Sequence, residues 1–341
     1  MGERRGVLVP AVVSDVVAVL TRELDAAYVY PEVAPAISAT VRRHLDDGRY
    51  VGLDGEAFAA RLTSDLQEVS GDKHLRVSFR SDPTPDGQQD EVARQRWEEY
   101  REHGERTNFG VVRVERLAGN VALLELCEFF DPELGGEVVV AAMNLVASAD
   151  ALIVDLRWNG GGSPAMVALV TSYLFDPEPV HLNDLYWRRG DVTRQFWTSA
   201  YVPGRRYGRE KPVWVLTSRE TFSGAEEFAN NLKQLGRAVL VGETTAGAAH
   251  PGSFVRLHAS FDAFIPTGRP INPISKGDWE GVGVAPDIDV PAADALRTAH
   301  AAALRHVLGR ISNPGSGALR RLADEAREAL AKLDGEQRSV G

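Results

Sequence analysis

A serine follows a short polar turn after an apolar segment, a place where a hydroxyl group could act as a nucleophile. Residues 213–217 read VWVLT, and Ser223 then opens the helical-looking segment GAEEFANNLKQLG. A hydroxyl group at the start of a helix lies at the positive end of the helix dipole, and the N–H group of Gly224 could stabilise an oxyanion. Serine is also a favoured helix N-cap, so the turn alone leaves a catalytic and a purely structural role open.

Three consecutive glycines are a second feature that could take part in catalysis or in binding. Gly160, Gly161 and Gly162 follow Asn159 at the end of the apolar segment 151–156. Glycines can adopt positive φ angles and expose main-chain N–H groups, which an oxyanion or a phosphate requires. The segment lacks the Lys-Ser/Thr pair of a phosphate loop and the spacing of a dinucleotide-binding loop. We therefore expect an oxyanion donor from Gly161, or from Gly160, rather than a phosphate site.

Three motifs in order make the chain similar to the tail-specific, or C-terminal processing, serine peptidases. They are DLRWNGGG at 155–162, TSRETFSGAEEFANNLKQLGRAVLVGETTAG at 217–247 and EGVGVAPDIDV at 280–290. The similarity extends from about His74 to Asp289, and the region between His74 and Gly110 is too short for a PDZ-like insert. The chain therefore resembles the branch that contains the tricorn protease and the interphotoreceptor retinoid-binding protein.

The resemblance implies a Ser-His-Glu catalytic triad. The family's nucleophile stands three residues before a glutamate, as Ser223 does here, so Ser223 is preferred over Ser218. The lysine base of the PDZ-bearing branch would stand at Ala248, so a Ser-Lys dyad is absent. The other branch has a histidine before the first strand and a glutamate before a G-V-x-P-D motif, and these match His74 and Glu280.

The implied chemistry is acyl transfer to a serine hydroxyl group. His74 would accept the Ser223 proton and return it to the leaving group, while Glu280 would hold the imidazole tautomer. The N–H groups of Gly224 and Gly161 would stabilise the oxyanion. This chemistry implies no metal ion and no other cofactor.

Two other residues are secondary candidates. Lys73 stands where the tricorn-like enzymes have a hydroxyl residue beside the histidine. His250 follows the GETTAG turn, close to where the other branch has its lysine, so a Ser223–His250 pair is the alternative to the triad. Asp155 and Arg157 are expected to form an internal ion pair at a strand end, without a catalytic role.

The resemblance implies a serine peptidase that cleaves peptides or unfolded chain ends through an acyl-enzyme. Two alternatives stay open. Retinoid-binding relatives use the same fold to hold apolar ligands, and a fold does not dictate one function. The acyl group could also pass to an acceptor other than water, as in a biosynthetic acyl hydrolase, a transferase or a peptide cyclase. Relatives often assemble, which makes a homo-oligomer an expectation.

The order of strand-like and helical segments predicts an α/β (α+β) fold that would position these residues. The resemblance implies a crotonase-like ββα spiral core. Apolar strands alternate with helices after Gly110, which predicts a mixed or parallel sheet. The first helix is expected to begin near Ser14 or Asp15. The expected domains are an N-terminal helical domain at 1–70, a His74-bearing strand and linker at 71–109, the catalytic domain at 110–291, and C-terminal helices at 292–341 that fray at their end.

Composition excludes several classes of protein. The 341 residues are 44% hydrophobic and 25% charged, as in globular proteins. A net charge of −10 argues against a nucleic-acid partner. Cys127 is the single cysteine, so no internal disulfide can form, and we expect it to be a small buried strand residue. No segment reaches the roughly 18 apolar residues of a membrane span. We expect a cytoplasmic protein without a membrane partner.

Overall fold

The computed structural model describes residues 6–83, 89–311 and 316–340 and divides the chain into two compact units. The first unit comprises Met1–Glu99, Asp184–Arg194 and Ala248–Ile271. The second comprises Tyr100–Asn183, Gln195–Gly247 and Asn272–Gly341. Both units are discontinuous in sequence, whereas the expected domain boundaries run consecutively along the chain.

The first unit begins with three helices, α1 (Pro10–Ala27), α2 (Ala34–Asp46) and α3 (Gly55–Ser70). They confirm the predicted helical N-terminal region. The start of α1 lies before the expected Ser14 or Asp15, because a proline near the first helical position sacrifices no intrahelical hydrogen bond. At α3, the Asp54 side chain accepts a hydrogen bond from the Ala57 N–H group at 2.9 Å, which caps the helix.

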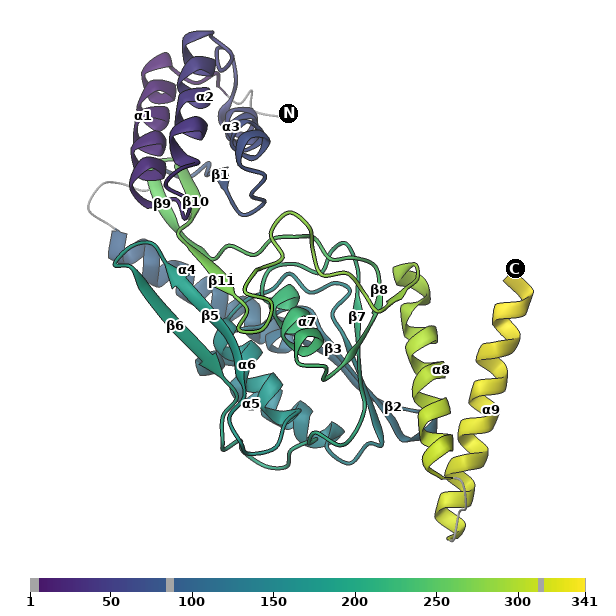
Figure 1. Ribbon diagram of the computed structural model, residues 1–341. Coiled ribbons are helices and arrows are strands. Elements are labelled where there is room, and N and C mark those ends of the chain that lie inside the picture. The colour runs from purple at the N-terminus through teal and green to yellow at the C-terminus, as the bar shows by residue number, and fades with distance from the viewer. Residues whose placement is uncertain (1–5, 84–88, 312–315, 341) are drawn as a thin grey trace. The chain divides into compact units, whose positions relative to one another are not determined.

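Three antiparallel strands complete the core of the first unit. They are β1 (Arg76–Phe79), β9 (Gly252–His258) and β10 (Phe261–Pro266), with β10 in the middle. Figure 1 shows helices α1 to α3 beside these strands, and Leu20, Phe58 and Phe261 are fully buried among them. His74 lies just before β1, so this sheet and the end of α3 fix its place. Helix α4 (Gln89–Arg106) follows.

The second unit is built on a six-stranded sheet in the order β12-β8-β7-β4-β3-β2. The strands are β2 (Val111–Leu117), β3 (Val121–Leu126), β4 (Ala151–Asp155), β7 (Val213–Thr217), β8 (Val239–Gly242) and β12 (Ile288–Asp289). All neighbours are parallel except β2 and β3, which confirms the predicted mixed sheet. Because β4 and β7 are parallel neighbours, the segments that follow them leave the sheet at the same edge.

Helices cover both faces of this sheet. They are α5 (Pro132–Val146), α6 (Pro164–Tyr173), α7 (Gly224–Gln234), α8 (Ala292–Arg310) and α9 (Gly317–Val340). Figure 1 shows α7 and α8 on opposite sides of β7 and β8. Helix α9 is described as far as Val340, in the region where fraying is expected. Within the described segments, no helix has both the length and the apolar character needed to cross a bilayer.

Some elements lie where the sequence analysis assigns none. Strands β5 (His181–Trp187), β6 (Val192–Trp197) and β11 (Gly268–Ile271) form a further sheet in the order β11-β5-β6. Short 3-10 helices occupy Asn108–Gly110 and Ala118–Asn120. Cys127 follows β3 and is only half-buried, so the prediction of a small buried strand residue is wrong. Partial burial still raises the pKa of its thiol group.

Candidate active site

The nucleophile candidate Ser223 has a strained main chain at the start of α7. Its φ is 53° and its ψ is −119°, a conformation that residues with a side chain rarely adopt. Such strain persists only where the surroundings enforce it, and it is typical of nucleophile turns between a strand and a helix. The Ser223 N–H group donates to Oε2 of Glu226 at 2.9 Å, which helps to hold the turn.

Glu226 ties this turn to two other segments of the second unit. Its carboxyl group is fully buried, and Oε1 accepts hydrogen bonds from Thr245 Oγ1 at 2.5 Å and from the Gly247 N–H group at 2.6 Å. Thr245 Oγ1 in turn accepts the N–H group of Val284 at 2.7 Å. The nucleophile turn is therefore linked to the turn after β8 and to the segment that follows Glu280.

Asn159 anchors the glycine loop to the nucleophile turn. Its side chain is fully buried, with Nδ2 donating to the Leu126 carbonyl oxygen at 3.0 Å and Oδ1 accepting the Gly161 N–H group at 2.8 Å. Its own carbonyl oxygen accepts the N–H group of Phe222 at 3.0 Å. The residue directly before Ser223 is thus hydrogen-bonded to the residue directly before the glycines.

The glycine loop lies against the main chain at Ser223. A Cβ atom added to Gly161, whose φ is 98°, would lie 2.8 Å from the Cβ atom of Ser223 and 2.8 Å from the Gly224 nitrogen. One added to Gly224 would lie 3.0 Å from the Gly162 nitrogen. Side chains at these positions would push the two segments apart, so glycine is required for the close approach.

The N–H groups of the three glycines differ in whether they already donate hydrogen bonds. Gly161 donates its N–H group to the asparagine side chain described above, and Gly160 donates to the Cys127 carbonyl oxygen at 3.1 Å. The structure therefore does not support the expectation of an oxyanion donor from Gly161 or Gly160. Gly162, whose nitrogen lies close to Gly224, is the better candidate. Sequence spacing could not separate the three glycines, because the choice depends on how each peptide is turned.

His74, the expected general base, is buried in the first unit. The residue is 5% exposed, and its ring centroid lies 5.9 Å from that of Phe264. Its main-chain N–H group donates to Asp72 Oδ1 at 3.0 Å. Burial lowers the pKa of His74 to about 4; Arg76 and His250 also lower this pKa, and Asp72 opposes them. At neutral pH the imidazole is therefore uncharged, as a proton acceptor must be.

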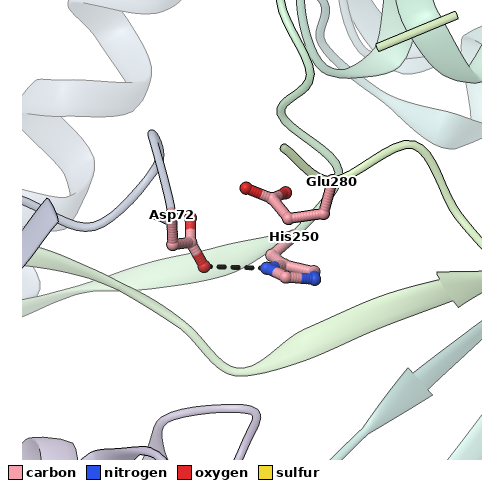
Figure 2. Close-up of side chains that lie close together, drawn as sticks. All are labelled: Asp72, His250 and Glu280. Atoms are coloured by element: carbon pink, nitrogen blue, oxygen red, sulfur yellow. Dashed lines mark hydrogen bonds and ion pairs between the residues drawn. The ribbon is translucent and has the colours of Figure 1, made fainter. Parts of the chain in front are cut away.

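The secondary candidates His250 and Lys73 also belong to the first unit. His250 is buried, and its Nδ1 lies 2.8 Å from Oδ2 of Asp72, as Figure 2 shows. Lys73 is exposed, and its carbonyl oxygen accepts a hydrogen bond from Gln67 Nε2 at 3.2 Å. Asp72 was not singled out in the sequence, although it stands only two residues before His74.

Glu280 is a partly buried residue of the second unit, which also contains Ser223. Its N–H group donates to Asp278 Oδ1 at 2.9 Å, and the following Gly281 N–H group donates to the Gly247 carbonyl oxygen at 3.1 Å. The second unit thus connects the nucleophile turn, the glycine loop and the Glu280 segment through hydrogen bonds. The pairing of Ser223 with His74 stays a prediction, because those two residues belong to different units.

The predicted ion pair at the end of β4 is confirmed. Arg157 donates from Nη2 to Asp155 Oδ2 at 2.7 Å and from Nε to Asp155 Oδ1 at 2.9 Å. Its Nη1 also donates to the Ala292 carbonyl oxygen at 2.8 Å. The pair connects the strand end to the start of α8, which is a structural role.

Glu227, the neighbour of Glu226 in α7, gives a testable pH dependence. Burial raises its pKa to about 7 from 4.5, and the side-chain amides of Asn183 and Asn231 oppose this shift. In the unfolded chain this carboxyl group releases its proton at a lower pH than in the folded chain. The wild type therefore loses about 3 kcal/mol of stability from this group as the pH rises from 4.5 to 7.

The Glu227→Gln variant has no proton to release at this position. Its free energy of unfolding, relative to the wild type, should therefore increase by about 3 kcal/mol between those two pH values. Urea unfolding at each pH measures this difference, and Glu220→Gln, at an exposed site, is the control. A difference between variant and wild type that stays constant with pH would contradict the assignment.

Two family models match separate parts of the chain. Residues 120–290 match a model described as Peptidase family S41. Residues 8–103 match a model described as the N-terminal domain of Peptidase_S41 in eukaryotic IRBP. The first match contains Ser223 and Glu280, and the second contains His74.

Individual proteins agree with these matches. The tail-specific protease of Haemophilus influenzae is 25% identical over 260 residues, which cover 72% of this chain and 35% of that protein. The chain thus spans about a third of the length of this relative. A lipoprotein from Streptococcus agalactiae has a similar structure, with a TM-score of 0.56 at 15% identity over 90% of this chain and 100% of that one. The tricorn protease has a TM-score of 0.51 at 13% identity over 84% and 35%. The two structures show a shared fold.

Proposed function

This chain belongs to peptidase family S41, and from that membership we propose that it is a serine peptidase. It hydrolyses peptide bonds through an acyl-enzyme on Ser223. The observation that carries this proposal is the strained Ser223 at the start of α7, held against a glycine loop by hydrogen bonds. A simple helix N-cap needs neither the strain nor the loop.

In the proposed reaction, the Ser223 hydroxyl group attacks the carbonyl carbon of the scissile peptide bond. His74 accepts the hydroxyl proton and passes it to the leaving amine, while Glu280 stabilises the imidazolium that forms. The N–H groups of Gly224 and Gly162 stabilise the oxyanion. Water then attacks the acyl-enzyme, with His74 again accepting a proton and passing it to Ser223, and the acid product is released. The low pKa of His74 supports its role, because the ring is uncharged at pH 7.

The substrates that fit a family of peptidases are peptides or unfolded protein chains. The net charge of −10 favours such partners over nucleic acids. A cytoplasmic location, no membrane partner and a homo-oligomeric state belong to the same proposal. Cell fractionation tests the first two, and size-exclusion chromatography with light scattering tests the third.

A fluorophosphonate probe provides the direct test of the nucleophile. It should label the wild type once per chain, on Ser223, and Ser223→Ala should abolish labelling. Ser218→Ala is the matched control, because Ser218 lies in the same turn but donates its hydroxyl hydrogen to the Arg157 carbonyl oxygen. Absence of labelling in the folded wild type would overturn the proposal and favour a binding protein on the same fold.

A further inference from the structure

The carboxyl group of Asp72 is shared by three segments of the first unit. Its Oδ1 accepts the His74 N–H group at 3.0 Å, and its Oδ2 accepts the Tyr28 hydroxyl group at 3.2 Å. Oδ2 also lies 2.8 Å from Nδ1 of His250, the contact drawn in Figure 2. The side chains of Asp72, Tyr28 and His250 are almost inaccessible to solvent. One buried carboxyl group therefore joins the end of α1, the segment before β9 and the main chain of His74.

The ring of His250 is held at both nitrogens within this unit. A carboxylate only accepts hydrogen bonds, so Nδ1 carries a proton and donates it to Asp72. The other nitrogen, Nε2, lies 3.4 Å from the Tyr30 hydroxyl group, and the Tyr30 and His250 rings meet edge-on with centroids 5.3 Å apart. These contacts fix the orientation of the ring and make it the buried partner of the Asp72 charge.

Asp72 and His250 act on the His74 ring with opposite signs. Asp72 favours the charged imidazolium form, whereas His250 and Arg76 disfavour it, and burial disfavours it most. Arg76 is held in place by a hydrogen bond from Nη1 to the His74 carbonyl oxygen at 3.2 Å. Without the opposing effect of His250, the Asp72 carboxylate would raise the pKa of His74, and burial and Arg76 alone would hold it down.

The same unit contains a second buried cluster of this kind, centred on Asp65. Asp65 accepts the Tyr50 hydroxyl group at 2.8 Å, lies 2.9 Å from His44 Nδ1 and pairs with Arg61 at 3.0 Å. It connects α2 and α3, which is a structural role. Asp65 and His44 therefore match the chemistry and burial of Asp72 and His250, and they serve as controls.

We propose that Asp72 and His250 are positioning residues for the base, holding the main chain of His74 and balancing the charge around its ring. This rests on the proposed function, in which His74 accepts the Ser223 proton. Asp72 fixes the segment, and His250 offsets the charge that Asp72 brings with it. The ring thus stays uncharged while its position is fixed by a buried carboxylate.

The test compares the variants Asp72→Asn and His250→Gln by two measurements. The first is NMR titration of the ¹³C-labelled His74 ring. Its pKa should fall by about one unit in Asp72→Asn and rise by about one unit in His250→Gln, because nearby charges shift a buried group by that order. The second is the rate of fluorophosphonate labelling against pH, whose acidic limb should move in the same two directions.

Two further sets of variants distinguish an effect on the His74 pKa from a simple loss of folding stability. Asp65→Asn and His44→Gln should lower the free energy of unfolding without moving the His74 titration. If either single variant at Asp72 or His250 fails to fold, the double variant Asp72→Asn/His250→Gln, which contains no buried unpaired charge, gives the answer. Its His74 pKa should lie close to that of the wild type, and a clear departure would overturn the proposal.

The two measurements separate this proposal from the peptidase proposal. Opposite shifts of the His74 titration without any labelling would support the charge balance and overturn the peptidase function. Labelling of Ser223 with a His74 titration that does not move, or moves the same way in both variants, would overturn the charge balance alone. A purely structural role for the pair would slow labelling at every pH equally and leave the acidic limb in place.

Discussion

The His74→Gln variant should hydrolyse peptides with a kcat/KM that is lower by about 10⁴-fold or more, because glutamine cannot accept the serine proton. The uncharged amide replaces an imidazole that is itself uncharged at pH 7, so the substitution buries no new charge. Steady-state kinetics on a peptide substrate measure the loss, and circular dichroism checks the fold. The effect should fall on kcat rather than KM, since the base acts in the transition state.

His250→Gln and His258→Gln are the controls for that experiment. His258 is a partly buried residue of β9, and its substitution should leave kcat/KM unchanged. His250→Gln should mainly move the pH profile. If His74→Gln retains activity within about tenfold of the wild type while His250→Gln loses about 10⁴-fold, the base is His250 and the triad is wrong.

Gly161→Ala should lower kcat/KM by about a hundredfold or more and destabilise the fold by about 1–3 kcal/mol. The added methyl group would lie 2.8 Å from the Ser223 Cβ atom and from the Gly224 nitrogen, so the nucleophile turn has to move. The positive φ of 98° adds strain for any residue with a side chain. Peptide kinetics and urea unfolding measure the two effects.

Gly160→Ala is the matched control for this substitution. A Cβ atom added there would meet no atom within 4 Å, and Gly160 is not among the glycines with a positive φ. Its kcat/KM should therefore stay within a few-fold of the wild type. Equal losses in the two variants would show that the loop contributes flexibility rather than close contact with the serine.

The elements of the second unit could be predicted largely from local sequence signals. The segments ending at Asp155 and Thr217 are apolar on both faces, and the structure makes them the fully buried strands β4 and β7. Small residues after a polar turn predicted the start of α7, and Ser223 is its N-cap. These patterns repeat over a few residues, so they do not depend on how distant segments pack.

The detail of the candidate site could not be predicted in this way. The strained main chain of Ser223 is stabilised by Glu226, whose own partners Thr245 and Gly247 come from a turn beyond the next strand. Asp72 and His250 lie 178 residues apart and meet only because β9 returns to the N-terminal helices. Nothing in the spacing of either residue indicates such a pairing.

Because the first unit is discontinuous in sequence, the segments that surround His74 are translated at different times. Among the described strands, β1 pairs with β10 alone, and β10 is translated after Ser223. His74 therefore leaves the ribosome long before Phe264, the ring beside it, and at about 5–20 residues per second the interval is roughly 10–40 s. Ser223, the proposed nucleophile, is translated only 41 residues before Phe264, so it and the surroundings of the proposed base are completed close together. Assembly of the proposed site is thus postponed until both of these downstream segments have been translated.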